Sequence, residues 1–178
     1  MRQLIVYFCL FFVFFSCGKK EKEISEFDMA FDSGITVPAG SSVDVPLNRY
    51  TSDISTNAEQ EFKDQDTRAE LIEYINIDAF SLGILSPNNQ GFGFAKSIKV
   101  YIDAEGLDET LIASISDIPE EVGRSIELEM QSSKNYKAYL SNETFVYRVN
   151  IVNNTTVSRD IEINISSSFK VRGDIYRE

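Results

Sequence analysis

The sequence of 178 residues contains no histidine, no tryptophan and only two cysteines, Cys9 and Cys17. The lack of histidine removes the commonest general base, the commonest metal ligand and every Ser-His-Asp or Cys-His arrangement. The lack of cysteine after residue 17 excludes thiolate zinc sites from the rest of the chain. The lack of tryptophan removes the strongest stacking platform for sugars, although eight tyrosines remain. We therefore expect a protein that is not an enzyme and that carries no cofactor.

Positive charge is also scarce. The chain has 17 lysines and arginines but 28 aspartates and glutamates, so the formal net charge is −11. Such an acidic chain is repelled by nucleic acid and by anionic lipid headgroups. The composition therefore predicts no nucleic-acid partner and favours cationic partners or calcium.

One unbroken run of apolar residues lies at the N-terminus. It spans 12 residues, Leu4 to Phe15, and follows the positively charged Arg2. As a helix it would be about 18 Å long, well short of the ~30 Å hydrocarbon core of a membrane. A buried core helix is also disfavoured, because the run has no polar face. Its length and position are typical of the hydrophobic region of a signal peptide.

The cleavage site of this signal peptide is predicted by the residues around Cys17. An ordinary secretory signal has small residues at positions −3 and −1, whereas cleavage after Ser16 would place the bulky Phe14 at −3. The segment Phe14-Phe15-Ser16-Cys17-Gly18 instead resembles the lipobox of bacterial lipoproteins, with phenylalanine where leucine is commonest. The resemblance covers the first 18 residues. It implies diacylglycerol on the Cys17 sulfur, cleavage before Cys17, and acylation of the new amino group with a fatty acid such as palmitate.

Lipidation of Cys17 predicts where the protein is located. Cys9 leaves with the signal peptide, and a Cys9–Cys17 disulfide is disfavoured because both residues lie in or beside the apolar run. Each buried CH₂ contributes about 0.8 kcal/mol, so two or three acyl chains on one residue anchor a protein durably. We expect an exported protein held on a membrane of the bacterial cell envelope, the outer membrane, by lipid on Cys17.

The chain divides into three parts. Residues 1–16 are the predicted signal peptide, residues 17–26 the lipidated cysteine and a charge-mixed tether, and residues 27–178 a single domain. A flexible tether of this length would reach about 15–18 Å.

From Phe27 onwards, apolar and polar residues alternate with the period of two that is typical of half-buried strands. One apolar and one polar face on each strand indicates antiparallel sheets that cover a shared core. We predict an all-β domain, a β-sandwich that is immunoglobulin-like in the broad sense, with a closed β-barrel as the alternative. The domain is similar to envelope lipoproteins that carry one such sandwich. The strands are expected at residues 35–37, 42–47, 75–84, 98–104, 111–115, 126–130, 145–151 and 161–169.

Two short helices are expected between strands. The sequence from Thr67 to Glu70 matches a capping box, in which the threonine hydroxyl and the glutamate satisfy each other's backbone amides. It predicts about two helical turns over residues 67–74. The residues Tyr136, Tyr139 and Leu140 have the spacing of one helical face and predict a second short helix over residues 133–140.

The sequence contains few candidate binding residues. Asp103, Glu105 and Asp108 surround a glycine and could hold Ca²⁺, but their spacing misses the known calcium loop, and a solvated turn is favoured. Phe92 and Phe94 alternate with glycines in residues 89–94. A binding loop that presents these rings is one interpretation, and rings that fill the core are the favoured one.

Three functions remain open at this level. The first is a membrane-anchored lipoprotein with a non-catalytic binding or structural role towards an envelope protein or glycan. The second is an enzyme, a carboxylate-based glycan hydrolase or a calcium-dependent lyase, which would need a deep pocket with two carboxylates about 5–10 Å apart. The third is a fibre or adhesin subunit that pairs through an edge strand.

Overall fold

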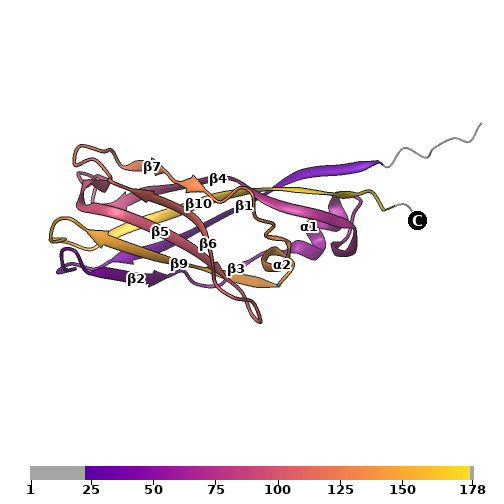
Figure 1. The fold of residues 1–178 in the computed structure, drawn as a ribbon, viewed down its shortest axis with the longest axis horizontal. Helices are drawn as coiled ribbons and strands as arrows, with labels where there is room; N and C mark the ends of the chain where they lie inside the picture. Colours follow the sequence, from indigo (N-terminus) through magenta and orange to yellow (C-terminus); the bar gives the residue numbers. More distant parts are fainter. Residues whose placement is uncertain (1–22, 177–178) are drawn as a thin grey trace, which may run out of the picture.

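The computed structural model describes residues 23–176, which form two antiparallel β-sheets packed face to face (Figure 1). This confirms the predicted β-sandwich; the sheets do not close into a barrel. The predicted signal peptide and Cys17 lie outside the described residues. The first sheet has the order β1-β10-β4-β7, formed by Ile24–Val37, Ile161–Asp174, Ile72–Ser86 and Ser125–Glu127. The second has the order β2-β9-β5-β6-β8, formed by Pro46–Tyr50, Thr144–Asn153, Ala95–Asp103, Thr110–Ser116 and Glu129–Met130, with β3 (Ile54–Ser55) also paired to β9.

The short helices agree only in part with the prediction. Helix α2 (Lys137–Leu140) lies within the predicted range of 133–140. The predicted helix over 67–74 is wrong, since only a 3₁₀ turn, η1 (Ala69–Leu71), precedes β4. The Thr67 hydroxyl donates to the carbonyl oxygen of Asp174, 2.7 Å away, instead of capping a helix. No helix within residues 23–176 has the length and apolar character needed to cross a membrane.

Helix α1 (Ala58–Asp64) was not predicted. Its apolar face consists of Ala58 and Phe62, both buried, and the rest of its sequence is polar. Two apolar residues in seven give too weak a period for a helix to be predicted. The helix is held by burial of Phe62, whose ring contacts Phe27 of β1 edge to face.

The N-terminal boundary of the domain differs from the prediction. β1 begins at Ile24, so residues 24–26, expected in the tether, belong to the first strand. They pair in antiparallel register with residues 172–174 of β10. Ser25 is buried, and its hydroxyl donates to the carbonyl oxygen of Gln65 at 3.0 Å. These long-range contacts, and not the charge-mixed local sequence, set the start of the domain.

Two other strands were also placed wrongly. The strand expected at 42–47 begins only at Pro46, and Val43 and Val45, which alternate with polar residues in the sequence, are exposed. β2 is an edge strand, where a proline at the first position costs no ladder hydrogen bond. The single strand expected at 126–130 is two short strands, because the chain leaves β4 of one sheet after β7 and joins β6 of the other as β8. Leu128 is buried at this crossing.

The core between the sheets is rich in aromatic rings. Phe31 of β1 contacts Phe145 of β9, and Phe80 of β4 contacts Tyr147 of β9, with ring centroids 5.1 and 5.4 Å apart. Both contacts are edge to face and join one sheet to the other. Phe92 and Phe94 of the 3₁₀ turn η2 (Phe92–Phe94) are buried, which confirms that these rings fill the core.

The buried tyrosines predict loss of stability at high pH. Burial raises the pKa of Tyr147 above its ordinary value of 10, and a hydrogen bond with Ser167 partly offsets this. Burial and the nearby Tyr139 raise the pKa of Tyr136 to about 12. Because the unfolded chain ionises its tyrosines near pH 10, the folded state loses stability as pH rises from about 10 to 12. Circular dichroism and absorbance at 295 nm should show unfolding and phenolate formation together in this range.

The variant Tyr147→Phe tests this assignment. It removes the ionisable group but keeps the ring, so its stability should decline less steeply above pH 10 than that of the wild type. Complete ionisation of all tyrosines near pH 10, with the β-sheet signal intact, would contradict the prediction.

Candidate functional site

The outer face of the second sheet carries a set of polar and aromatic side chains from β2, β9 and β5. In one row across the sheet, Tyr50 lies opposite Arg148, and Arg148 lies opposite Tyr101. In the next row, Asn48, Asn150 and Lys99 are neighbours in the same way. Their side chains point outwards because alternate residues of a strand point to opposite faces and the intervening residues Val149 and Val100 are buried. With Glu109 of the β5–β6 turn, these residues are called the tyrosine–arginine face.

Arg148 is the centre of this face. Its Nε and Nη2 atoms donate to the two carboxylate oxygens of Glu109 at 2.5 and 2.6 Å, and Nη1 donates to Asn48 Oδ1 at 2.7 Å. The guanidinium lies over the ring of Tyr101, 4.1 Å from its centroid. The hydrogen bond with Glu109 raises the pKa of Arg148 further above its ordinary value. One side chain thus fixes β2, β5, β9 and the β5–β6 turn relative to one another.

The hydrogen bonds of Arg148 to Glu109 and Asn48 are called the Arg148 clamp, and around it several polar groups have no hydrogen-bond partner in the described part of the chain. Asn150 Nδ2 donates to Asn48 Oδ1 at 2.9 Å, which orients both amides. Among the described residues, the structure gives no hydrogen-bond partner for Asn48 Nδ2, Asn150 Oδ1, Lys99 Nζ or the Tyr50 hydroxyl. The Tyr50 side chain is 61% exposed. The face therefore offers one oriented donor and one oriented acceptor, on Asn48 and Asn150, beside an accessible aromatic ring.

A groove lies elsewhere, between the β3–α1 segment and the turn that precedes β9. It has a volume of about 680 Å³ and is open to solvent. Most of its lining is hydroxyl and amide side chains, among them Ser55, Asn57, Gln60 and Asn142. Thr56 is almost fully buried there, and its hydroxyl donates a hydrogen bond to the carbonyl oxygen of Asn142 at 2.6 Å. The groove is wide and polar, unlike the enclosed, largely apolar pockets that usually hold small ligands.

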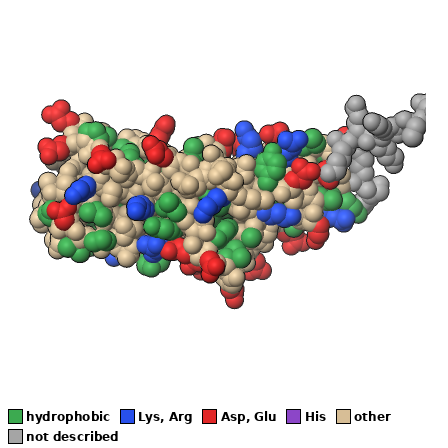
Figure 2. Space-filling view, viewed as in Figure 1, with side chains coloured by type: hydrophobic (Ala, Val, Ile, Leu, Met, Phe, Trp, Pro, Cys, Tyr) green, Lys and Arg blue, Asp and Glu red, His purple; other side chains and the backbone are tan. Residues whose placement is uncertain are grey.

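The acidic residues that the sequence suggested for calcium lie at the β5–β6 hairpin. Asp103 and Glu105 line an open groove of about 410 Å³ with Asp53, whereas Asp108 is not in its lining. The carbonyl oxygen of Asp108 accepts a hydrogen bond from the Tyr139 hydroxyl at 2.6 Å. Within residues 23–176, no group of three or more aspartates and glutamates is placed to hold a metal ion. In Figure 2, acidic side chains occupy this projecting hairpin and the end of the domain opposite the start of β1 (Figure 1).

The tyrosine–arginine face was not identified from the sequence. The sequence does indicate which residues of two of its strands point outwards. Arg148 and Asn150 alternate with apolar residues, and so do Lys99 and Tyr101. It does not indicate the order of the strands, and without that order the residues of 48–50, 99–101 and 148–150 could not be placed side by side.

Comparisons with known proteins identify no family. No family model matches the chain, and no curated protein matches it. Among solved structures, it is similar to a chain of turnip yellow mosaic virus, at 15% identity and a TM-score of 0.34 over 100% of this chain and 93% of that one. A chain of Desmodium yellow mottle tymovirus matches at 8% identity and a TM-score of 0.30, over 88% and 92%. TM-scores below 0.5 carry no inference about function.

Proposed function

We propose that this protein is a lipid-anchored lipoprotein of the bacterial envelope whose sandwich is a non-catalytic binding domain. The tyrosine–arginine face is its binding surface. The observation that carries the proposal is the clamp of Arg148, which fixes the surface groups of three strands while leaving the outermost donors and acceptors open. Groups held in place before binding lose little entropy on binding, and this favours affinity.

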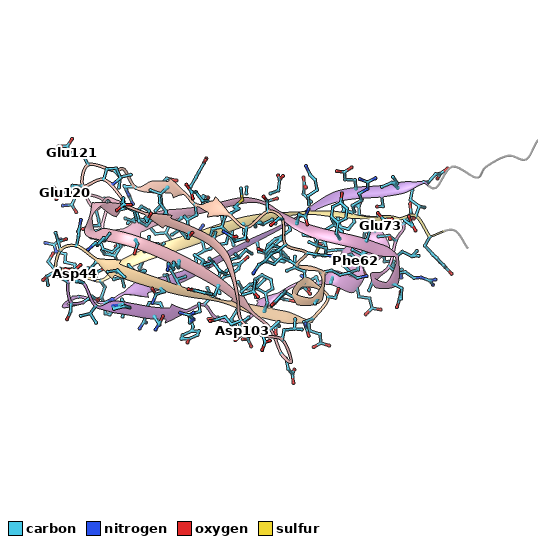
Figure 3. The ribbon with its side chains drawn as sticks, in the orientation of Figure 1. Asp44, Phe62, Glu73, Asp103, Glu120 and Glu121 are labelled. Carbon is cyan, nitrogen blue, oxygen red and sulfur yellow. The ribbon has the colours of Figure 1, made fainter. Side chains whose placement is uncertain are left out.

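The position of the N-terminal strand supports an upright orientation on the membrane. Six residues separate Cys17 from Ile24, the start of β1, and they span at most about 20–25 Å. β1 runs along the long axis of the domain, and its first residue pairs with Asp174 near the C-terminus (Figure 1). A lipid on Cys17 would hold this end near the bilayer. Asp44, Glu120 and Glu121 lie at the opposite end of the domain (Figure 3), and in this orientation they would point away from the membrane.

The anchor is tested by replacing Cys17 with alanine. We expect the wild type to incorporate labelled palmitate and to sediment with membranes. The variant should incorporate no label and keep its unprocessed N-terminus, because the lipoprotein peptidase requires the modified cysteine. Treatment with globomycin should likewise block processing of the wild type. Normal processing and soluble release in the presence of globomycin would contradict the proposal.

The binding role is tested with the full chain, kept in a zwitterionic detergent without sugar so that its lipid does not insert into membranes. The washed envelope fragments of the producing bacterium are first extracted with the same detergent, so that sedimentation reports binding by the domain and not by the anchor. We expect the protein to sediment with the fragments and the variant Tyr50→Ala to sediment less. The matched control is Tyr74→Ala, which removes a tyrosine hydrogen-bonded to Arg172 on the outer face of the other sheet. Equal sedimentation of both variants and the wild type would show that the tyrosine–arginine face is not the binding surface.

The two alternative functions have less support. The two grooves near acidic residues are open to solvent, and within residues 23–176 neither of them encloses a pair of carboxylates in a deep pocket. β1 is a 14-residue edge strand, which would suit pairing between subunits. Its outward positions, however, include the exposed acids Glu26, Asp28 and Asp32, and charges on an edge strand oppose pairing with a second copy.

A further inference from the structure

We infer that the ligand of the tyrosine–arginine face is an uncharged, hydroxyl-rich glycan. The inference rests on the proposed function, because it names the ligand class of the same surface. It is drawn from the hydrogen-bonding groups, the charge and the aromatic exposure of the face.

The open groups of the face match the chemistry of sugar hydroxyls. A hydroxyl both donates and accepts hydrogen bonds, and the face supplies both kinds of partner within two neighbouring rows. Asn48 Nδ2 and Lys99 Nζ are donors, Asn150 Oδ1 is an acceptor, and the Tyr50 hydroxyl is both. The amides of Asn48 and Asn150 are already oriented by their mutual hydrogen bond of 2.9 Å. A ligand with hydroxyls at intervals along a chain can therefore bind these two amides without reorienting them.

The exposed ring of Tyr50 supplies the apolar part of the site. Tyrosine presents a flat apolar body together with a polar tip, which suits ligands with both kinds of surface. A pyranose ring has such a surface, with C–H groups on its faces and hydroxyls on its rim. With 61% of its surface exposed, Tyr50 has room for a ring to stack against it.

The charge of the face favours a neutral ligand. The chain has a formal net charge of −11. On the tyrosine–arginine face, Arg148 forms a bidentate ion pair with Glu109. Among the residues that the structure describes, Lys99 is then the one charged residue of the defined face without a partner of opposite charge. An anionic polymer would be repelled by the rest of the domain, and a cationic one would find no acidic groups free on this face. A glycan without charge avoids both penalties.

A protein partner fits these residues less well. The centre of a protein–protein interface is enriched in apolar side chains and depleted in charged ones. Here the centre is the Arg148–Glu109 pair with two asparagines, and Tyr50 is the single strongly exposed aromatic residue of the face. A protein partner would instead be recognised by loss of binding after protease treatment.

The test divides the envelope fragments into three portions. One is untreated, one is oxidised with periodate and then reduced with borohydride, and one is digested with a protease that is afterwards inactivated and washed away. Periodate cleaves the vicinal diols of sugars, and borohydride removes the aldehydes that would react with lysines. We expect sedimentation of the full chain to fall at least tenfold after periodate and to remain unchanged after protease. Loss after protease alone would overturn the glycan inference and leave a binding domain for a protein.

Substitutions assign the effect to the face. We expect Tyr50→Ala to weaken binding to the protease-treated fragments about tenfold, Tyr50→Phe to retain most of the affinity, and Tyr74→Ala to bind as the wild type. Asn150→Ala should also weaken binding, because it removes the acceptor and one of the two hydrogen bonds that orient the amide of Asn48. Circular dichroism of each variant checks that it is folded. Full binding by both Tyr50→Ala and Asn150→Ala would overturn the inference, and no sedimentation by the wild type would also overturn the proposed function.

Discussion

Replacement of Gly93 by alanine should lower the free energy of unfolding by about 2–4 kcal/mol. An added Cβ at this position would lie 1.9 Å from the carbonyl oxygen of Glu120 and 2.7 Å from its carbonyl carbon. Both are backbone atoms, so no flexible side chain can move aside. The neighbours Phe92 and Phe94 are buried, which prevents the segment from shifting outwards without exposing a ring. Urea titration followed by circular dichroism gives the free energy directly.

Gly83→Ala is the matched control for this substitution. Gly83 lies in β4, and a Cβ there would have no atom within 4 Å. We expect it to be neutral or to stabilise by about 0.4–1 kcal/mol, because alanine restricts the unfolded chain more than glycine does. Similar stabilities for the two variants would show that the residue 120 backbone does not limit the space at Gly93.

Replacement of Phe145 by alanine should cost about 3–5 kcal/mol. Phe145 is 1% exposed, and its ring contacts Phe31 and Tyr147, each with ring centroids 5.1 Å apart. The substitution leaves a cavity between the two sheets, where the backbone of β9, paired on both sides, cannot collapse to fill it. Urea titration is again the measurement, with an unchanged dependence on urea concentration expected.

Two further variants separate the loss of volume from the loss of ring contacts. Phe145→Leu keeps most of the volume, so it should cost less than half as much as alanine. A double-mutant cycle of Phe145→Ala with Phe31→Ala should give a coupling of about 0.5–1.5 kcal/mol. Strict additivity would show that the edge-to-face contact adds nothing to the burial of the two rings.

The strands at the centre of each sheet could be predicted from the sequence, since their two faces differ sharply. Ile161, Ile163, Ile165 and Phe169 alternate with polar residues, and all four are buried in β10. A central strand pairs on both sides and packs one face on the core. Apolar and polar residues therefore alternate along it without interruption, and the pattern is easily recognised in the sequence. This regularity was sufficient to predict the β-sandwich.

The edges and the candidate site depend on contacts between residues far apart in the chain. Thr67 fits a capping box locally, but its hydroxyl is used by Asp174, 107 residues away. Val43 and Val45 alternate as in a strand, although no neighbouring strand pairs with them there beyond one bridge from Val43 to Asn153. The tyrosine–arginine face likewise depends on such contacts, because Arg148 donates hydrogen bonds to Glu109 and Asn48, which are far from it in the sequence. Sequence periodicity carries no information about which strands are neighbours.

The continuous pairing of β1 with β10 has a mechanical consequence for an anchored protein. A load applied to the domain and resisted at the N-terminus would pull β1 along its own axis. Fourteen residue pairs join β1 to β10, and their hydrogen bonds run across the strands. A pull in this direction shears all of these bonds together, whereas a pull across the sheet would open them one after another. The domain should therefore withstand its greatest force in the direction in which a lipid at Cys17 would hold it.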